Sequence, residues 1–111
     1  MMTVEERIKM YKDKKAFIDN ISKALVLSKT TVMRVDYEVY SRYNPEYDTT
    51  YYAEFAVVTF TGGAKSVRTI SGNSDSANFR EIGKLLDGGY YDENRYYEDV
   101  VSNCEKVNLE D

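Results

Sequence analysis

Residues 3–27 carry apolar side chains at the spacing of one helical face. The apolar positions recur at intervals of three, four and seven residues, the period of an amphipathic helix: Val4, Ile8, Tyr11, Ile18, Ile21 and Leu25. Thr3 followed by Glu6 is a capping box that would start this helix. The opposite side carries lysines interleaved with acids, which we interpret as a solvated face rather than a nucleic-acid patch. The pattern therefore predicts a first helix over residues 3–27.

From Thr31 the pattern changes to strict alternation, which is typical of a half-buried strand. We predict that Thr31, Met33, Val35, Tyr37 and Val39 face the helices while Val32, Arg34, Asp36, Glu38 and Tyr40 face water. Turn residues in Asn44–Asp48 separate this strand from a second one over Thr49–Thr61. Gly62-Gly63 then leads into a third strand near Lys65–Ile70. Such short connections predict an antiparallel meander with one face covered by the first helix.

The rest of the chain predicts two short helices. Residues 71–76 form a loop that ends in good N-capping residues, and the helix that follows is closed by Gly88-Gly89. A last helix runs from about Asp92 to Cys104. The prediction is therefore one α+β domain over residues 1–111, of order αβββαα, with a three-stranded antiparallel sheet packed against an N-terminal helix and two short C-terminal helices. We expect one core containing Ile8, Ile18, Ile21, Val35, Val57, Phe79, Ile82 and Leu85.

Composition argues against familiar catalysis. Histidine is absent and Cys104 is the single cysteine, which removes the commonest general acid/base, the usual nucleophile pairs and thiolate metal clusters. The Thr61–Ser66 stretch ends in Lys-Ser but lacks the spacing of a phosphate loop, and a hairpin turn explains it. The carboxylate pairs Asp92-Glu93 and Glu98-Asp99 leave open a small enzyme or an oxygen-ligated metal site, although adjacent acids are usually solvated charge. We predict a binding protein without catalytic residues, metal or cofactor.

The acidity of the chain is concentrated near its C-terminal end. The net charge is −4, whereas residues 87–111 hold two basic and eight acidic residues, a net charge of −6. Stabilisation of Asp92 and Glu93 by a helix dipole explains part of this pattern. Carboxylates spaced by rigid tyrosines also resemble phosphates flanked by stacking surfaces, which suits a groove lined with Arg and Lys. We predict that the partner-binding residues are Asp87, Tyr90, Tyr91, Asp92, Glu93, Glu98 and Asp99.

The segment from Ile70 to Asp111 resembles the small phage-encoded anti-CRISPR proteins that inhibit type II Cas9 by imitating the PAM duplex. The resemblance rests on the element order, the size and a series of short matches along this segment: Ile70-Ser71 at a strand end, a cap rich in Ser, Asn and acid, a short helix with Phe79, Ile82 and Leu85, a glycine, and Asp92-Glu93 followed by Tyr96-Tyr97-Glu98-Asp99. It implies that Asp92 and Glu93 occupy the pocket where Cas9 arginines read the PAM guanines. The family's second acidic element lies in the turn between its last two strands, where this chain has Thr61–Lys65 with no acid and one base.

These observations lead to one main hypothesis and two alternatives. The main hypothesis is a phage or mobile-element inhibitor that docks an acidic face into the nucleic-acid groove of a protein, Cas9 with guide RNA in particular, inside a bacterial host cell. The first alternative is a phage structural, assembly or self-associating module whose tyrosine-rich strands pair at an edge; the second is a small enzyme. We expect no direct binding of nucleic acid, a monomer or small homo-oligomer, and a cytoplasmic location without membrane contact, because no apolar run approaches ~20 residues.

Overall fold

The first helix, α1 (Val4–Ser28), begins at the predicted capping box. In the computed structural model, which describes residues 2–28, 31–70, 74–86 and 94–110, the Glu6 amide donates to Thr3 Oγ1 at 3.0 Å and the Thr3 amide donates to Glu6 Oε1 at 3.3 Å. One side of α1 buries Tyr11, Ile18 and Ile21, which confirms the helical period. Ile8 is only half-buried and joins no cluster of buried side chains, so its predicted place in the core is wrong.

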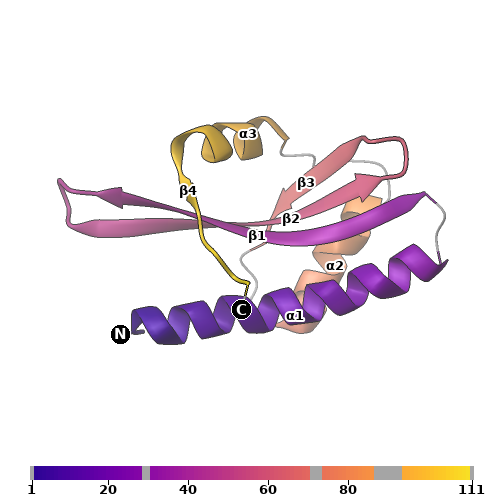
Figure 1. Cartoon of the computed structure of the whole chain (residues 1–111), viewed down its shortest axis with the longest axis horizontal. Helices are drawn as coiled ribbons and strands as arrows, with labels where there is room; N and C mark the ends of the chain where they lie inside the picture. Colours follow the sequence, from indigo (N-terminus) through magenta and orange to yellow (C-terminus); the bar gives the residue numbers. More distant parts are fainter. Residues whose placement is uncertain (1, 29–30, 71–73, 87–93, 111) are drawn as a thin grey trace.

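Four strands form one antiparallel sheet in the order β3-β2-β1-β4 (Figure 1). The predicted meander is confirmed and consists of β1 (Val32–Asn44), β2 (Thr49–Phe60) and β3 (Lys65–Thr69). The prediction of three strands omitted β4 (Glu105–Lys106), which pairs with Tyr40 and Ser41 of β1. A strand of two residues carries no periodicity of its own, so hydrophobic patterning could not reveal it.

The helices cover both faces of the sheet. α2 (Asp75–Leu86) is capped by Ser74, whose hydroxyl accepts the Ala77 amide at 3.2 Å, as the N-capping residues in this loop predicted. α3 (Asn94–Asn103) lies on the opposite side of the sheet from α1 and α2 (Figure 1). The α+β class is confirmed, with the described order αβββααβ. None of the described helices is long and apolar enough to cross a membrane.

The sheet separates two apolar clusters, which corrects the prediction of a single core. The cluster beneath the sheet joins α1, α2 and β1 with the C-terminal Leu109, whereas the cluster above it contains Val57 and packs against α3: Tyr40, Phe55, Val57, Val67 and Val100. Phe79 was predicted to be in the core but is 60% exposed. The buried face of α2 runs through Asn78, Ile82 and Leu85, and Phe79 lies one position away from it.

A bulge in β1 explains why part of the predicted strand pattern is inverted. Val32 pairs with Phe60 and Arg34 pairs with Thr59, so Met33 is an extra residue in β1. Val35, Tyr37 and Val39 are buried against the helices as predicted. Before the bulge the faces are reversed, because Val32 is buried whereas Thr31 and Met33 are exposed. Tyr40 was assigned to water and is instead buried under α3, on the second covered face.

Candidate protein-binding surface

The predicted binding residues divide into two groups. Asp87, Tyr90, Tyr91, Asp92 and Glu93 lie outside the described residues. Glu98 and Asp99 lie on α3, and both are exposed. Among the described residues, the candidate binding surface is therefore the outer side of α3. The side chains that hold α3 on the sheet support this surface.

Tyr97 fixes the position of α3 on the sheet. Its hydroxyl donates to Glu38 Oε1 at 2.7 Å, and the Tyr40 hydroxyl donates to the same oxygen at 2.5 Å. The Tyr97 ring also meets Phe55 edge-on with the centroids 5.2 Å apart, and Tyr40 at 6.1 Å. Edge-to-face aromatic pairs add to the stabilisation from area burial. Glu38 is therefore an internal acceptor for two tyrosines, and not the water-facing acid that strand alternation predicted.

Burial and the shared carboxylate keep both tyrosines protonated. Burial and then the hydrogen bond to Glu38 raise the pKa of Tyr97 to about 12. The same two causes raise the pKa of Tyr40 well above its ordinary value. Ionising either ring would place a second negative charge beside Glu38 in a partly desolvated site. The two hydroxyls therefore act as hydrogen-bond donors across the neutral pH range.

The N-terminal end of α3 is attached to the sheet at another point. The Asn94 side-chain amide donates to the Lys65 carbonyl at the start of β3, over 3.1 Å. Val100 is buried in the cluster above the sheet, and Cys104 packs against the same cluster. Glu98 and Asp99 consequently lie on a helix that contacts the sheet through Asn94, Tyr97 and Val100, which gives their carboxylates a fixed support.

A second carboxylate is buried on the opposite face of the sheet. Glu54 Oε1 accepts from Lys14 Nζ at 2.7 Å and from the Tyr37 hydroxyl at 2.6 Å. The side chains of Lys14 and Glu54 are 9% and 16% exposed, so this ion pair is largely removed from solvent. Burial and then the bond to Glu54 raise the pKa of Tyr37 far above its ordinary value. The network ties α1 to both central strands, β1 and β2.

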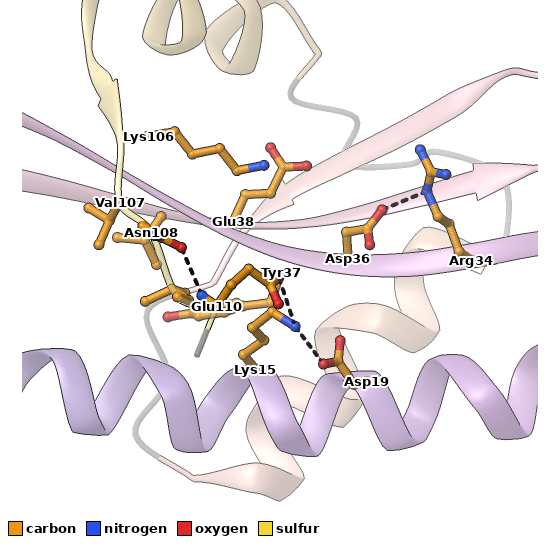
Figure 2. Close-up of a pocket in the computed structure, with 12 residues that line it drawn as sticks. Lys15, Asp19, Arg34, Asp36, Tyr37, Glu38, Lys106, Val107, Asn108 and Glu110 are labelled. Carbon is orange, nitrogen blue, oxygen red and sulfur yellow. Dashed lines mark hydrogen bonds and ion pairs between the residues drawn. The ribbon is translucent and has the colours of Figure 1, made fainter.

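A cleft of about 560 Å³ opens between α1, the outer edge of β1 and the segment after β4. Figure 2 shows that charged side chains from all three elements project around it. Lys15 pairs with Asp19 at 2.7 Å and with Glu110 at 3.5 Å, while Arg34 pairs with Asp36 at 2.8 Å. Lys106 extends over the mouth of the cleft toward Glu38 (Figure 2). Hydrophobic patterning could not reveal this cleft, because its lining comes from separate parts of the chain that range from Lys15 to Glu110.

Comparisons with known proteins assign no family to the chain. No protein-family model matches it, and no curated protein and no solved structure is significantly similar to it. Within the described ranges, no three cysteine, aspartate or glutamate side chains are grouped closely enough to hold a metal ion.

Proposed function

We propose that this chain is a phage or mobile-element anti-CRISPR inhibitor, a non-enzymatic protein that binds Cas9 with an acidic, DNA-mimicking face and blocks recognition of the PAM and target DNA. The observation that carries the proposal is the exposure of Glu98 and Asp99 on a helix anchored to the sheet by Tyr97. These acids lie within a segment of net charge −6. Carboxylates at fixed positions are electrostatically complementary to a groove that binds phosphates through Arg and Lys.

The sequence of residues 70–111 supports Cas9 as the partner. Asp92 and Glu93 precede α3 directly, and in the resembling family acids at this place meet the arginines that otherwise read the PAM guanines. Those arginines bind guanine edges bidentately, and a pair of carboxylates offers them equivalent acceptors. Inhibition then results from occupancy of the groove, and the inhibitor is not consumed.

The experiment measures cleavage and binding of target DNA by guide-loaded Cas9 with increasing amounts of the protein. The double variant Asp92→Ala with Glu93→Ala should weaken inhibition about tenfold or more, because truncating one member of a desolvated charge pair costs ~2–5 kcal/mol. The matched control is Glu5→Ala with Asp13→Ala, which removes two exposed acids from α1. An unchanged rate of cleavage with excess wild-type protein, across several type II Cas9 proteins, would reject the proposal.

A self-associating binding module is the second candidate, and the hairpin between β1 and β2 favours it. The tip of this hairpin projects beyond the other elements (Figure 1), and three tyrosines near it, Tyr43, Tyr47 and Tyr51, are 56%, 66% and 53% exposed. Tyrosine is enriched at protein interfaces because it provides a large contact area at low entropic cost. A mass in solution that rises with concentration, and that falls after Tyr43→Ser with Tyr51→Ser, would favour this candidate over the inhibitor.

A further inference from the structure

The outer edge of β1 is occupied along only part of its length. Val39 accepts a hydrogen bond from the Val107 amide at 2.8 Å, just beyond the two residues of β4 that pair with β1. At the other end of this edge, the Val35 amide donates to Ser22 Oγ of α1 at 2.8 Å. Backbone groups alternate in direction along a strand, so Tyr37, midway between Val35 and Val39, directs its N–H and C=O to the same edge.

Tyr37 marks the open part of this edge. Tyr37 lies opposite Ala56 of β2 in the register, but its backbone N–H and C=O share the outward direction of the Val35 N–H and the Val39 C=O. On the outer edge of β1, the described strand pairing is limited to Tyr40 and Ser41, which pair with β4. The hydrogen bond from Tyr37 to Glu54 is made by the Tyr37 hydroxyl, so it does not use the Tyr37 backbone. An edge with unpaired backbone groups is a template for another extended chain.

The cleft provides the space that an added strand needs. After Val107 the chain turns away from β1: Asn108 Oδ1 accepts the Glu110 amide at 2.9 Å, and Glu110 reaches Lys15 of α1. Tyr37 lines the resulting cleft, and Figure 2 shows α1 below this region and Asp36 and Glu38 of β1 above it. Among the described residues, the fourth position in the sheet is thus filled by β4 at one end, and no strand fills it beside Tyr37.

The charges around the opening define the occupant. Four acids and three bases line the cleft. Lys15 and Arg34 pair with three of these acids, and the lining as a whole keeps an excess of one negative charge, which favours a basic occupant over an acidic one. We propose that the edge of β1 around Tyr37 binds an extended, basic segment of a partner protein, which joins the sheet as a strand in line with β4. Backbone hydrogen bonds supply the affinity in such additions, and side chains on alternate positions supply the selectivity. This inference does not depend on Cas9 being the partner.

The test uses a short peptide of alternating Lys and Val as the probe. The full chain, labelled with ¹⁵N, is titrated with this peptide while amide shifts and amide hydrogen exchange are followed. Exchange of the Tyr37 amide should slow, with shifts concentrated at residues 34–38. A peptide of the same sequence with methylated backbone nitrogens cannot donate these bonds and should bind about tenfold more weakly or worse. A Glu/Val peptide should also bind more weakly.

Charge reversal provides a matched pair of variants. Asp36→Lys places a base beside the open edge and should weaken binding of the Lys/Val peptide about fivefold, while strengthening that of the Glu/Val peptide. The control is Asp13→Lys, because Asp13 also pairs with one exposed base, Lys9, but lies on α1 and does not line this cleft. Circular dichroism checks that both variants fold. The comparison of the methylated and unmethylated Lys/Val peptides uses the wild-type protein, so it does not depend on either variant.

Three results would overturn the inference. The first is equal binding of the methylated and unmethylated peptides, and the second is a set of shifts that avoids β1. The third is protection of the Tyr37 amide that grows with protein concentration alone, since the edge would then be filled by a second copy of the chain. None of these results depends on inhibition of Cas9, so this inference and the proposed function can fail separately.

Discussion

Tyr97 of α3 donates its hydroxyl hydrogen to Glu38 of β1 over 2.7 Å, although 59 positions separate the two residues along the chain. Glu38 also receives the Tyr40 hydroxyl, so one carboxylate of the central sheet joins α3 to β1. Because Glu98 and Asp99 lie directly beside Tyr97, this bond determines how the acidic side of α3 is presented. It links the stability of the fold to the proposed binding face.

Replacing Tyr97 with Phe should test this link. The variant keeps the ring and its contact with Phe55 but removes one hydrogen bond to a carboxylate, which should lower the free energy of unfolding by about 1.5–3 kcal/mol. Urea unfolding followed by circular dichroism measures the change. Tyr43→Phe is the control, because the Tyr43 hydroxyl bonds to Asp48 on the exposed hairpin, and this change should leave the midpoint nearly unaltered. Equal midpoint shifts would contradict a special role for Tyr97.

The Lys14–Glu54 pair should be sensitive to removal of one partner. Glu54→Gln leaves the Lys14 ammonium largely buried without its counter-charge, which costs about 3–5 kcal/mol. The double variant Lys14→Met with Glu54→Gln removes both charges and should recover a large part of this loss. Denaturant unfolding of the two variants gives the comparison. A double variant less stable than Glu54→Gln alone would mean that the ion pair is not what makes the single change costly.

Ile18 has no exposed surface and lies in the cluster beneath the sheet. Ile18→Ala should therefore lower the free energy of unfolding by about 2–5 kcal/mol, and Ile21→Ala by a similar amount, through lost burial and the cavity left behind. Leu27→Ala on the same helix is the control, because Leu27 is 88% exposed and its truncation should have little effect. A midpoint for Ile18→Ala that matches that of Leu27→Ala would show that α1 does not pack on the sheet through this side.

Local signals in the sequence predicted most of the fold. The capping box, the period of α1 and the turns at Asn44–Asp48 and Gly62-Gly63 each depend on neighbouring residues, and all agree with the structure. The bulge at Met33 has no local signature, and it inverts the burial of the residues before it. The second covered face depends on α3 returning to the sheet from a distant part of the chain, so Tyr40 and Glu38 were assigned to water.

The candidate site was less accessible to sequence reasoning than the fold. Charge density identified Glu98 and Asp99, which are exposed as a binding residue must be, while five of the seven predicted residues lie outside the described ranges. The open edge beside Tyr37 and the cleft next to it arise where β4 ends and the chain turns at Asn108. A gap in strand pairing depends on tertiary contacts, and no pattern of side chains within β1 encodes it.

Stability should decrease in alkaline solution because folded tyrosines hold their protons more tightly than unfolded ones. The pKa of Tyr97 is raised to about 12, and those of Tyr40 and Tyr37 are raised as well, whereas an unfolded tyrosine titrates near about 10. The stability that these three tyrosines contribute is fully present below about pH 10 and is lost as the pH rises through their pKa values in the folded protein. Urea midpoints measured across this range should fall, and Tyr97→Phe should reduce the slope. A flat profile would contradict the raised pKa values of these hydroxyls.

Association with the partner should depend on salt through the acidic side of α3. Fixed surface charge speeds encounter with an oppositely charged groove, and salt screens this attraction over a Debye length of about 8 Å at physiological ionic strength. Glu98→Ala with Asp99→Ala should therefore slow association with guide-loaded Cas9 roughly two- to tenfold at low salt and should flatten the salt dependence, without changing the urea midpoint, because both side chains are exposed. Glu5→Ala with Asp13→Ala changes the net charge equally on α1, far along the chain from α3. Surface plasmon resonance at several salt concentrations measures the association rates of the two double variants for comparison. If both double variants slow association equally, total charge rather than the α3 face controls the encounter.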